Sequence, residues 1–281
     1  MKVLLTGADG QLGRALVRTA PEQVKIVALG HREFDICDAG QVQRRAASER
    51  PDLIVNAAAY TAVDKAESER ERAFAVNRDG VANLAASGVR LVQISTDYVF
   101  DGEASSPYPV DAPTGPINVY GASKLAGEKA AGEDALIVRT SWLYHPDGAN
   151  FVTTMLRLMR ERGTVKVVND QFGTPTSAVS AASAIWALAM QDARGTGHAT
   201  DSGVASWYDF AVAIAEEARA SGLLATMPEV LPVSTSHFPT PARRPAYSVL
   251  DTGKTEAMLG RKAPHWRDNA RAAIAQVKRH G

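Results

Sequence analysis

Tyr120 and Lys124 are the two residues whose types and spacing most directly suggest chemistry. They lie four residues apart in YGASK (120–124) and form the only Tyr-x-x-x-Lys pair in the 281-residue sequence. On a helix, this spacing places a phenol and an ammonium group on the same face. The pair could donate a proton to a reacting group, or it could be two surface residues one helical turn apart.

The segment TGADGQLG (6–13) places Gly7, Gly10 and Gly13 between an apolar stretch and a helical pattern. This spacing differs from the Gly-x-Gly-x-x-Gly pattern of many dinucleotide-binding proteins. The physical effect is shared, because glycines allow a tight turn and let backbone N–H groups approach a pyrophosphate at the positive end of a helix. We therefore expect a nucleotide here, the alternative being a glycine-rich turn without a ligand.

The end of the second expected strand carries Gly30, His31 and Arg32. A cofactor with a free ribose 2′-hydroxyl would favour a carboxylate at this position, whereas Arg32 could bind a 2′-phosphate. The sequence therefore predicts NADPH as the cofactor. The alternatives are NADH as the cofactor and Arg32 as a solvated surface residue.

The first half of the chain alternates between short apolar segments and helical patterns. Five segments rich in Val, Ile and Leu are expected to be buried strands: 2–7, 24–30, 52–59, 90–96 and 135–141. Helices are expected at 11–19, 39–50, about 67–87 and 118–132. Asp38 and Gln41 have the spacing of a capping box for the second of these. Apolar strands that alternate with helices predict an α/β fold with a Rossmann-like, doubly wound parallel sheet covered on both faces.

The pattern loosens after about residue 145. The expected elements there are helices at 150–163, 180–193, 206–222 and from about Trp266, a strand at 164–170, and a loop-rich segment at 227–251. We expect two interleaved parts that form effectively one compact unit. Residues 1–145 would form the dinucleotide-binding core, and residues 146–281 would complete the sheet and add a small C-terminal substrate lobe.

Acidic and basic residues balance at 31 each, which gives no reason to expect nucleic acid or a membrane surface as a partner. A single cysteine, Cys37, excludes an intramolecular disulfide and a cysteine zinc cluster. His31, His145, His198 and His237 have no metal-ligand spacing and are expected to be surface or packing residues. The amino terminus lacks the apolar core of a signal peptide, and no run of 18 apolar residues occurs, so we expect a cytoplasmic protein.

Nine short motifs along the chain carry a family resemblance. In order they are TGxxGQLG (6–13), FDICD (34–38), NAAAYTAVDKAE (56–67), AVNRDG (75–80), STDYVFDG (95–102), YGASKLAGE (120–128), RTSWLY (139–144), NDQFGTPT (169–176) and RPAYSVLD (244–251). Each motif alone is weak, but the ordered set is specific and covers essentially the whole chain. In these motifs the sequence resembles the extended short-chain dehydrogenase/reductases, and within them the dTDP-4-dehydrorhamnose reductases.

The resemblance implies a role for each catalytic candidate. Tyr120 would protonate the C4 carbonyl oxygen of the sugar as hydride arrives. Lys124 would hold the nicotinamide ribose and move the pKa of Tyr120 toward the working pH. Thr96, beside Ser95 at the end of the fourth strand, would steady the carbonyl.

The resemblance also implies two sets of binding residues. Those for the cofactor are Gly7, Gly10, Gln11, Leu12, Gly13, Arg32, Asp35, Ile36, Ala57, Ala58, Ala59, Tyr60, Ser95, Tyr120 and Lys124. Those for the substrate are Thr96, Asp97, Tyr98, Val99, Trp142 and Arg244. Thr96, Trp142 and the three alanines could instead be ordinary strand-end or packing residues. Arg244 could bind the nucleotide diphosphate or form a salt bridge.

The activity that the resemblance implies is the NAD(P)H-dependent reduction of dTDP-4-dehydro-L-rhamnose to dTDP-L-rhamnose, a precursor of bacterial surface polysaccharide. Some members of the family dimerise with help from a divalent cation such as Mg²⁺. A homodimer and a bound cation are therefore expectations from the resemblance alone, and the sequence assigns no metal ligand.

Three alternative functions remain open at this point. The chain could be another nucleotide-sugar reductase, an epimerase or dehydratase of the same fold, or a non-catalytic regulatory subunit of the methionine adenosyltransferase type. A dehydratase is disfavoured because Asp97 is followed by Tyr98, where such enzymes commonly have a glutamate. The intact set of Thr96, Tyr120 and Lys124 argues for catalysis.

Overall fold

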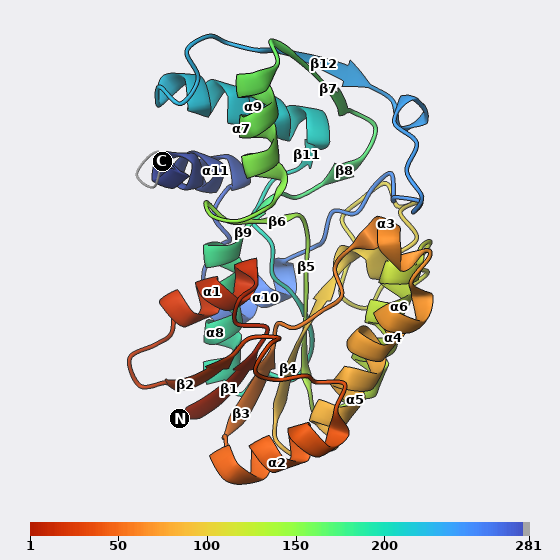
Figure 1. Ribbon diagram of the computed structural model, residues 1–281, viewed down its shortest axis with the longest axis vertical. Helices are drawn as coiled ribbons and strands as arrows, with labels where there is room; N and C mark the ends of the chain where they lie inside the picture. Colours follow the sequence, from red (N-terminus) through yellow and green to blue (C-terminus); the bar gives the residue numbers. More distant parts are fainter. Residues whose placement is uncertain (278–281) are drawn as a thin grey trace.

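The computed structural model describes residues 1–277 and has a six-stranded parallel sheet at its centre (Figure 1). The strands are β1 (Lys2–Thr6), β2 (Lys25–Leu29), β3 (Leu53–Asn56), β4 (Leu91–Thr96), β5 (Leu136–Thr140) and β10 (Gly195–His198). They lie in the order β10-β5-β4-β3-β1-β2, and every neighbouring pair is parallel. This arrangement confirms the predicted doubly wound α/β fold and its five predicted strands.

The sixth strand, β10, lies outside the predicted set. Its sequence, GTGH, has two glycines and no aliphatic side chain, so it carries no strand signal. It joins the sheet by pairing along β5, with Gly195 opposite Leu136 and His198 opposite Arg139. Residues from the second half of the chain thereby extend the sheet formed by the first half.

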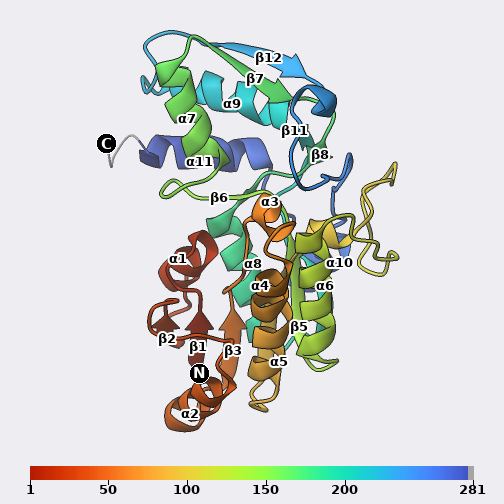
Figure 2. The same ribbon diagram turned by 45° about the vertical axis from the view of Figure 1, so that its right-hand side comes forward.

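Alternate strand residues face two different layers of helices. One layer consists of α1 (Gln11–Arg18) and α8 (Ala178–Met190), and the other of α2 (Ala39–Glu49), α5 (Gly80–Ala85) and α6 (Val119–Ala131) (Figure 2). Leu5 and Val55 pack into the first layer, whereas Leu4 and Ile54 pack into the second. Strands buried on both faces need apolar residues at every position, which is why their sequences lack a polar alternation.

The helix expected over about 67–87 is present at 70–85, as α4 (Arg70–Phe74), a π-helical turn (Ala75–Asp79) and α5, which follow one another directly. The short helix α3 (Val63–Ala66) precedes it. At the π-helical turn, the Asn77 side chain accepts the N–H of Tyr60 at 2.9 Å and donates to the Tyr60 carbonyl at 3.0 Å and to Ser123 Oγ at 2.9 Å. The widened turn places Asn77 between a cleft-side loop and α6, a contact that a regular helix would not provide.

The predicted capping box of α2 forms only in part. Asp38 caps the helix as expected, because its carboxylate accepts the Gln41 N–H at 2.9 Å. The reciprocal bond is absent from α2, since the Gln41 side chain accepts the N–H of Asp35 instead. The backbone N–H of Asp38 is already donated to the Asp35 carbonyl, so it has no need of Gln41.

A smaller lobe lies beyond the carboxyl ends of the strands (Figures 1 and 2). It consists of α7 (Phe151–Glu161), β7 (Thr164–Val168), α9 (Trp207–Ala220), β12 (Glu229–Val233) and α11 (Trp266–Val277). These elements surround a separate apolar core that includes Tyr144, Leu156, Phe210 and Trp266. Two short ladders, β6 (Leu143–Tyr144) with β9 (Thr176–Ser177) and β8 (Phe172–Gly173) with β11 (Ala205–Ser206), lie between the lobe and the sheet.

The segment expected to be rich in loops, 227–251, contains more regular structure than its prolines suggest. β12 pairs in parallel with β7, and a 3-10 turn follows at Thr235–His237. Pro232 fits in β12 because the strand has a neighbour on only one side and forms an edge. Within residues 1–277, no helix is both long and apolar enough to cross a membrane.

Candidate active site

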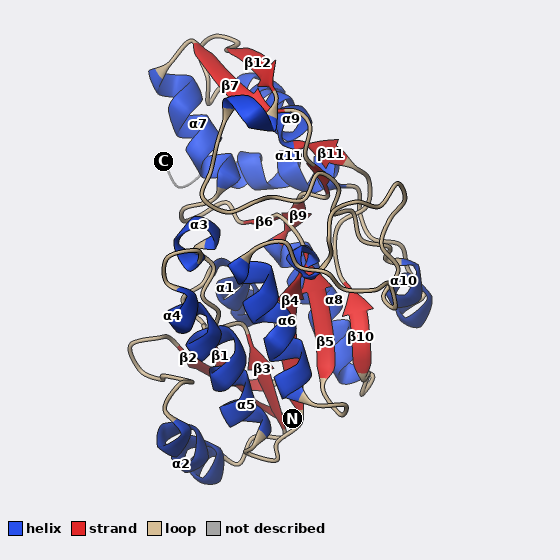
Figure 3. Cartoon of the chain, turned by 90° about the vertical axis from the view of Figure 1, so that its right-hand side faces the viewer, coloured by secondary structure: helices blue, strands red, loops and turns tan. Residues whose placement is uncertain are grey.

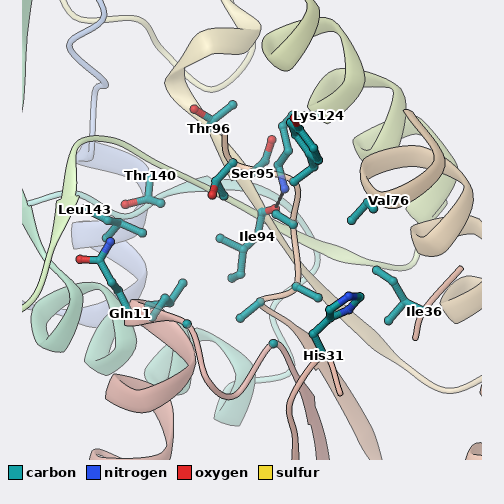
Figure 4. A pocket seen from close by; sticks show the side chains of 18 of the residues that line it. Gln11, His31, Ile36, Val76, Ile94, Ser95, Thr96, Lys124, Thr140 and Leu143 are labelled. Atoms are coloured by element: carbon teal, nitrogen blue, oxygen red, sulfur yellow. Dashed lines mark hydrogen bonds between the residues drawn. The ribbon is translucent and has the colours of Figure 1, made fainter. Parts of the chain in front are cut away.

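The order of the strands creates a crevice between β1 and β3. The chain leaves β1 for β2 on one side and returns to β3 on the other, and ligands of doubly wound sheets bind where the strand order reverses in this way. A cleft of about 590 Å³ lies there and reaches the segment after β5. Figure 4 shows Thr96, Ser95 and Lys124 gathered at one side of it and His31 and Ile36 at the other.

The glycine loop forms the floor of the cleft. Gly7 has a φ of +66°, and a Cβ atom there would lie 2.5 Å from the backbone nitrogen of Ala58, so any side chain would collide with β3's continuation. Gly13 packs equally closely, since its Cβ would lie 2.2 Å from the Gly7 carbonyl oxygen. The first turn of α1 has no acidic residue, and its N-cap, Gly10, makes no side-chain hydrogen bond. Backbone N–H groups at this helix end are therefore available to an anion.

Tyr120 and Lys124 lie on the first turns of α6, and both line the cleft. Asn118 caps this helix by accepting the Gly121 N–H at 2.8 Å. Gly121 lies so close to the loop after β4 that a Cβ atom would be 2.1 Å from the Tyr98 carbonyl oxygen. This close packing brings the rings of Tyr98 and Tyr120 to 5.9 Å, edge to face.

Burial shifts the pKa values of both catalytic candidates. It lowers the pKa of the Lys124 ammonium to about 8, an effect that the nearby Glu128 carboxylate partly opposes. It raises the pKa of the Tyr120 phenol to about 12, while a hydrogen bond from Thr96 acts in the opposite direction. The net shift of the Tyr120 pKa is thus upward, and the expected lowering of that pKa by Lys124 stays a prediction.

A buried chain of polar side chains holds Lys124 in place. Lys124 Nζ donates to the Ile94 carbonyl at 2.6 Å, and Gln93 Nε2 donates to the same oxygen at 2.7 Å. Gln93 Oε1 accepts from Asn56 Nδ2 at 2.7 Å, and Asn56 Oδ1 accepts from the Thr6 hydroxyl. This chain crosses β4, β3 and β1 beneath the cleft and fixes the carbonyl that anchors the ammonium group.

Thr96 sits between Tyr120 and a buried acid. Its hydroxyl donates to Asp97 Oδ1 at 2.9 Å and accepts the Tyr98 N–H at 3.2 Å. Asp97 is only 2% exposed, and burial raises the pKa of its carboxyl to about 6, although hydrogen bonds with Ser248 and Thr96 act against the rise. The Thr96 hydroxyl has one proton, so it can donate a hydrogen bond either to Asp97 or to the phenolate form of Tyr120. Thr96 therefore links the two titratable groups.

Three polar atoms in the wall of the cleft have no partner among the residues that the structure describes. They are Gln11 Oε1, Ser95 Oγ and Thr140 Oγ1, all buried. Unpaired buried groups are costly, so their convergence on one cleft fits a polar ligand such as a dinucleotide. Thr140 is absent from the predicted set, although it could have been found, since it pairs in register with Thr96 at the carboxyl end of the neighbouring strand.

Trp142 lines the cleft on the side of the lobe and is held rigidly. Its φ of 44° is unusual for a non-glycine residue, and its indole stacks on Trp207 with the ring centroids 3.5 Å apart. Gly173 packs directly against the indole ring, because a Cβ atom at this position would lie 2.5 Å from Trp142 Cε2. These contacts set the position of Trp142 independently of any ligand.

Most of the predicted binding residues line the cleft together. They are Gly7, Gly10, Gln11, Leu12, Asp35, Ile36, Ala57, Ala58, Ala59, Tyr60, Ser95, Thr96, Tyr120, Lys124 and Trp142. His31, expected to be a surface or packing residue, also lines it, as do Arg72, Val76, Ile94 and Leu143. His31 lies in the loop after β2, whereas the other four lie on α4, the π-helical turn, β4 and β6, and all five reach the cleft through the tertiary fold.

The other predicted binding residues lie outside the cleft wall. Gly13 is buried in α1, and Arg32 is exposed. Asp97, Tyr98 and Val99 lie in the 3-10 turn after β4, where Val99 is fully buried. Arg244 forms a two-bonded ion pair with Asp64, at 2.9 and 2.7 Å, which is the salt-bridge alternative for this residue. Their roles in binding remain predictions.

The fold and the site define the class of protein. A doubly wound sheet with a glycine loop at its switch point, and a Tyr-x-x-x-Lys pair beside a strand-end threonine, define an oxidoreductase of the extended short-chain dehydrogenase/reductase class that binds a nicotinamide cofactor. Within this class the chain belongs to the family described as "RmlD substrate binding domain", whose model matches residues 1–279. The family resemblance found in the sequence is thereby confirmed.

Relatives in the family share long stretches of the sequence. The chain is 44% identical to a dTDP-4-dehydrorhamnose reductase of Burkholderia thailandensis, over 95% of this chain and 96% of that one. It is 42% identical to the enzyme of the same name from Escherichia coli, over 99% and 98% of the two chains.

Solved structures agree with this assignment. A dTDP-4-dehydrorhamnose reductase of Bacillus anthracis, described in complex with NADP, has a TM-score of 0.92 and 38% identity and covers 98% of this chain and 99% of its own. The ortholog from Clostridium acetobutylicum also has a TM-score of 0.92 at 38% identity, over 99% and 100% of the chains. A dTDP-glucose 4,6-dehydratase of Streptomyces venezuelae, 20% identical with a TM-score of 0.81, shares the fold.

Proposed function

We propose that this protein is a dTDP-4-dehydrorhamnose reductase, which reduces the C4 ketone of dTDP-4-dehydro-L-rhamnose to the alcohol of dTDP-L-rhamnose. The observation that carries the proposal is the convergence of Tyr120, Thr96 and Lys124 on one nucleotide-sized cleft. Relatives that carry the reductase name match this chain over nearly its whole length, which supports the same reaction here.

The residues of the cleft fit a nicotinamide cofactor. The close-packed Gly7, the open N-terminus of α1 and the unpaired atoms of Ser95 and Thr140 together provide a floor and polar contacts for a dinucleotide. When bound, the reduced cofactor supplies the hydride that the C4 carbon accepts. The chain must then provide a proton and hold the reacting oxygen.

Tyr120 provides the proton in this proposal. With a pKa of about 12, its phenol is protonated at neutral pH and can transfer its proton to the developing C4 alkoxide. Thr96 stabilises the phenolate that remains, because its hydroxyl can turn from Asp97 to Tyr120. Lys124, tied to the Ile94 carbonyl, supplies positive charge in the same cleft.

NADPH is the proposed cofactor, in preference to NADH. Arg32 is exposed near the end of β2, and the neighbouring His31 lines the cleft, so both are candidates to contact a 2′-phosphate. Arg32→Ala should reduce the preference for NADPH over NADH. An unchanged ratio of kcat/KM for the two cofactors would assign the selectivity to other residues.

We propose that residues 1–145 bind the cofactor and that residues 146–281 complete the sheet and shape the sugar site, as the sequence suggests. Residues 278–281 lie outside the described part of the chain. A homodimer and a divalent cation such as Mg²⁺ are proposed from family resemblance alone. Within residues 1–277, no group of three or more His, Cys, Asp or Glu side chains is arranged to hold a metal. Light scattering with and without EDTA tests both expectations.

The proposed reaction is tested by supplying purified protein with dTDP-4-dehydrorhamnose and NADPH, with NADH in parallel. We expect one NADPH oxidised for each dTDP-L-rhamnose formed. Conversion of the sugar without net cofactor consumption would indicate an epimerase. Cofactor binding without oxidation would indicate either another nucleotide sugar as the substrate or a non-catalytic subunit.

A further inference from the structure

A second, smaller cavity lies at the β10 edge of the sheet. It has a volume of about 200 Å³ and lies between α8, the end of β10, α10 (Gly253–Leu259) and residues 261–264. Figure 3 shows α10 beside β10 at this edge of the molecule. The cavity shares none of its lining residues with the nucleotide cleft.

Four side chains that line this cavity carry a buried polar atom without a hydrogen-bond partner in the described chain, and one of the four atoms is Nδ2 of Asn269, on α11. The other three are His198 Nε2, Thr200 Oγ1 and Thr255 Oγ1, whose residues are 0%, 5% and 4% exposed. An unpaired buried polar group destabilises the folded protein. Four such groups, from β10, the loop after it, α10 and α11, converge on one cavity and point to a polar occupant.

The hydrogen bonds around His198 define what this occupant must offer. His198 Nδ1 lies 3.0 Å from the carbonyl oxygen of Asp251, and because a carbonyl can only accept, Nδ1 carries the proton. Burial, assisted by the positive charge of Arg139, lowers the pKa of the ring to about 4, so the ring is neutral at physiological pH. Its Nε2 is therefore an acceptor and requires an O–H or N–H donor, which the hydroxyls of a polyol provide.

The rim of the cavity is positively charged. Arg261 and Lys262 line it, are exposed, and make no ion pair with another residue in 1–277. Glu256, the acid in the wall, keeps its negative charge while its Oε1 accepts from Thr252 Oγ1 and from the Ala263 N–H, both at 3.1 Å, so the lining carries two positive charges and one negative charge. The free charge at the entrance thus favours an anionic group.

We propose that this cavity binds a small polyol phosphate, with ligand hydroxyls on His198, Thr200 and Thr255 and the phosphate between Arg261 and Lys262. The volume of about 200 Å³ suits a short phosphorylated polyol and excludes a dinucleotide, which needs a space of the size of the main cleft. The site is independent of the proposed reductase activity.

Glycerol 3-phosphate is a suitable probe, titrated calorimetrically into the full chain with NADP⁺ saturating the nucleotide cleft. We expect glycerol 3-phosphate to bind. Glycerol alone or inorganic phosphate alone should bind at least about tenfold more weakly, because each offers only half of the contacts. Thr255→Val, which replaces the hydroxyl with a methyl group, and Arg261→Ala, at the exposed rim, should each weaken binding by about tenfold. The KM for NADPH should remain unchanged in both variants.

Three results would overturn the proposal. The first is no binding of glycerol 3-phosphate, which would leave water to satisfy the four buried atoms. The second is equal binding by wild type, Thr255→Val and Arg261→Ala, which would place the ligand elsewhere. The third is inorganic phosphate binding as tightly as glycerol 3-phosphate, which would show that the hydroxyl contacts contribute nothing. Arg261→Ala carries the test if Thr255→Val fails to fold.

Discussion

Asp97→Asn should stabilise the protein at neutral and alkaline pH. Asp97 is 2% exposed, and burial raises the pKa of its carboxyl from 3.8 to about 6. A group whose pKa is raised by folding contributes a stability that is complete below its unfolded pKa and is lost as the pH rises through the folded value. Above pH 6 the folded protein therefore holds an ionised carboxylate at a cost that the unfolded chain does not bear.

The size of this cost follows from the shift. A rise of about two pKa units corresponds to about 3 kcal/mol at pH 8, and to about half of that at pH 5. The asparagine amide has no charge to bury and can still accept the Thr96 hydroxyl in place of Oδ1. The free energy of unfolding of Asp97→Asn should exceed that of wild type by up to about 3 kcal/mol at pH 8 and by much less at pH 4.

Urea unfolding of both proteins at several values between pH 4 and pH 8 measures this difference. Asp111→Asn is the matched control, because Asp111 is exposed and the same change there should give no pH-dependent gain. A constant difference between Asp97→Asn and wild type across this range would refute the reasoning. So would a variant less stable than wild type at pH 8, which would show that the carboxylate is stabilised by its neighbours and not penalised by burial.

Two further substitutions test other parts of the site. Gly7→Ala should weaken NADPH binding by at least tenfold, because the new Cβ would lie 2.5 Å from the Ala58 nitrogen and residue 7 has a φ of +66°. Fluorescence titration measures the Kd for NADPH, and an unchanged Kd would contradict the role assigned to the glycine loop. Glu128→Gln removes the partner of Arg139, bound at 2.9 and 2.7 Å in a buried pair, and should cost about 3–5 kcal/mol of stability in urea unfolding. Glu128 also raises the pKa of Lys124, which is about 8, so the alkaline limb of the pH–rate profile should move to lower pH in this variant. An unmoved limb would show that Glu128 does not affect the pKa of Lys124.

The sequence allows the sheet and the core of the site to be predicted because their signals are local. Runs of Val, Ile and Leu mark buried strands, and the Tyr120–Lys124 spacing is a property of five consecutive residues. The buried chain of hydrogen-bonded side chains through Asn56 and Gln93 has only a faint signal in the sequence, which is a polar residue within an otherwise apolar strand. The stacking of Trp142 on Trp207 left none, because it joins residues far apart in the chain whose approach depends on the packing of the lobe. β10 also has no signal in the sequence, because it contains no apolar residue that would mark a buried strand.

The central claim is that Tyr120 donates the proton at the reacting carbonyl, and Tyr120→Phe tests it most directly. The measurement is NADPH oxidation with dTDP-4-dehydrorhamnose by wild type, Tyr120→Phe and the control Tyr208→Phe, alongside the Kd of each protein for NADPH. The account predicts that kcat falls by about 10²–10⁴-fold in Tyr120→Phe alone, with the NADPH Kd within a few-fold of wild type. Near-normal turnover by Tyr120→Phe would contradict it.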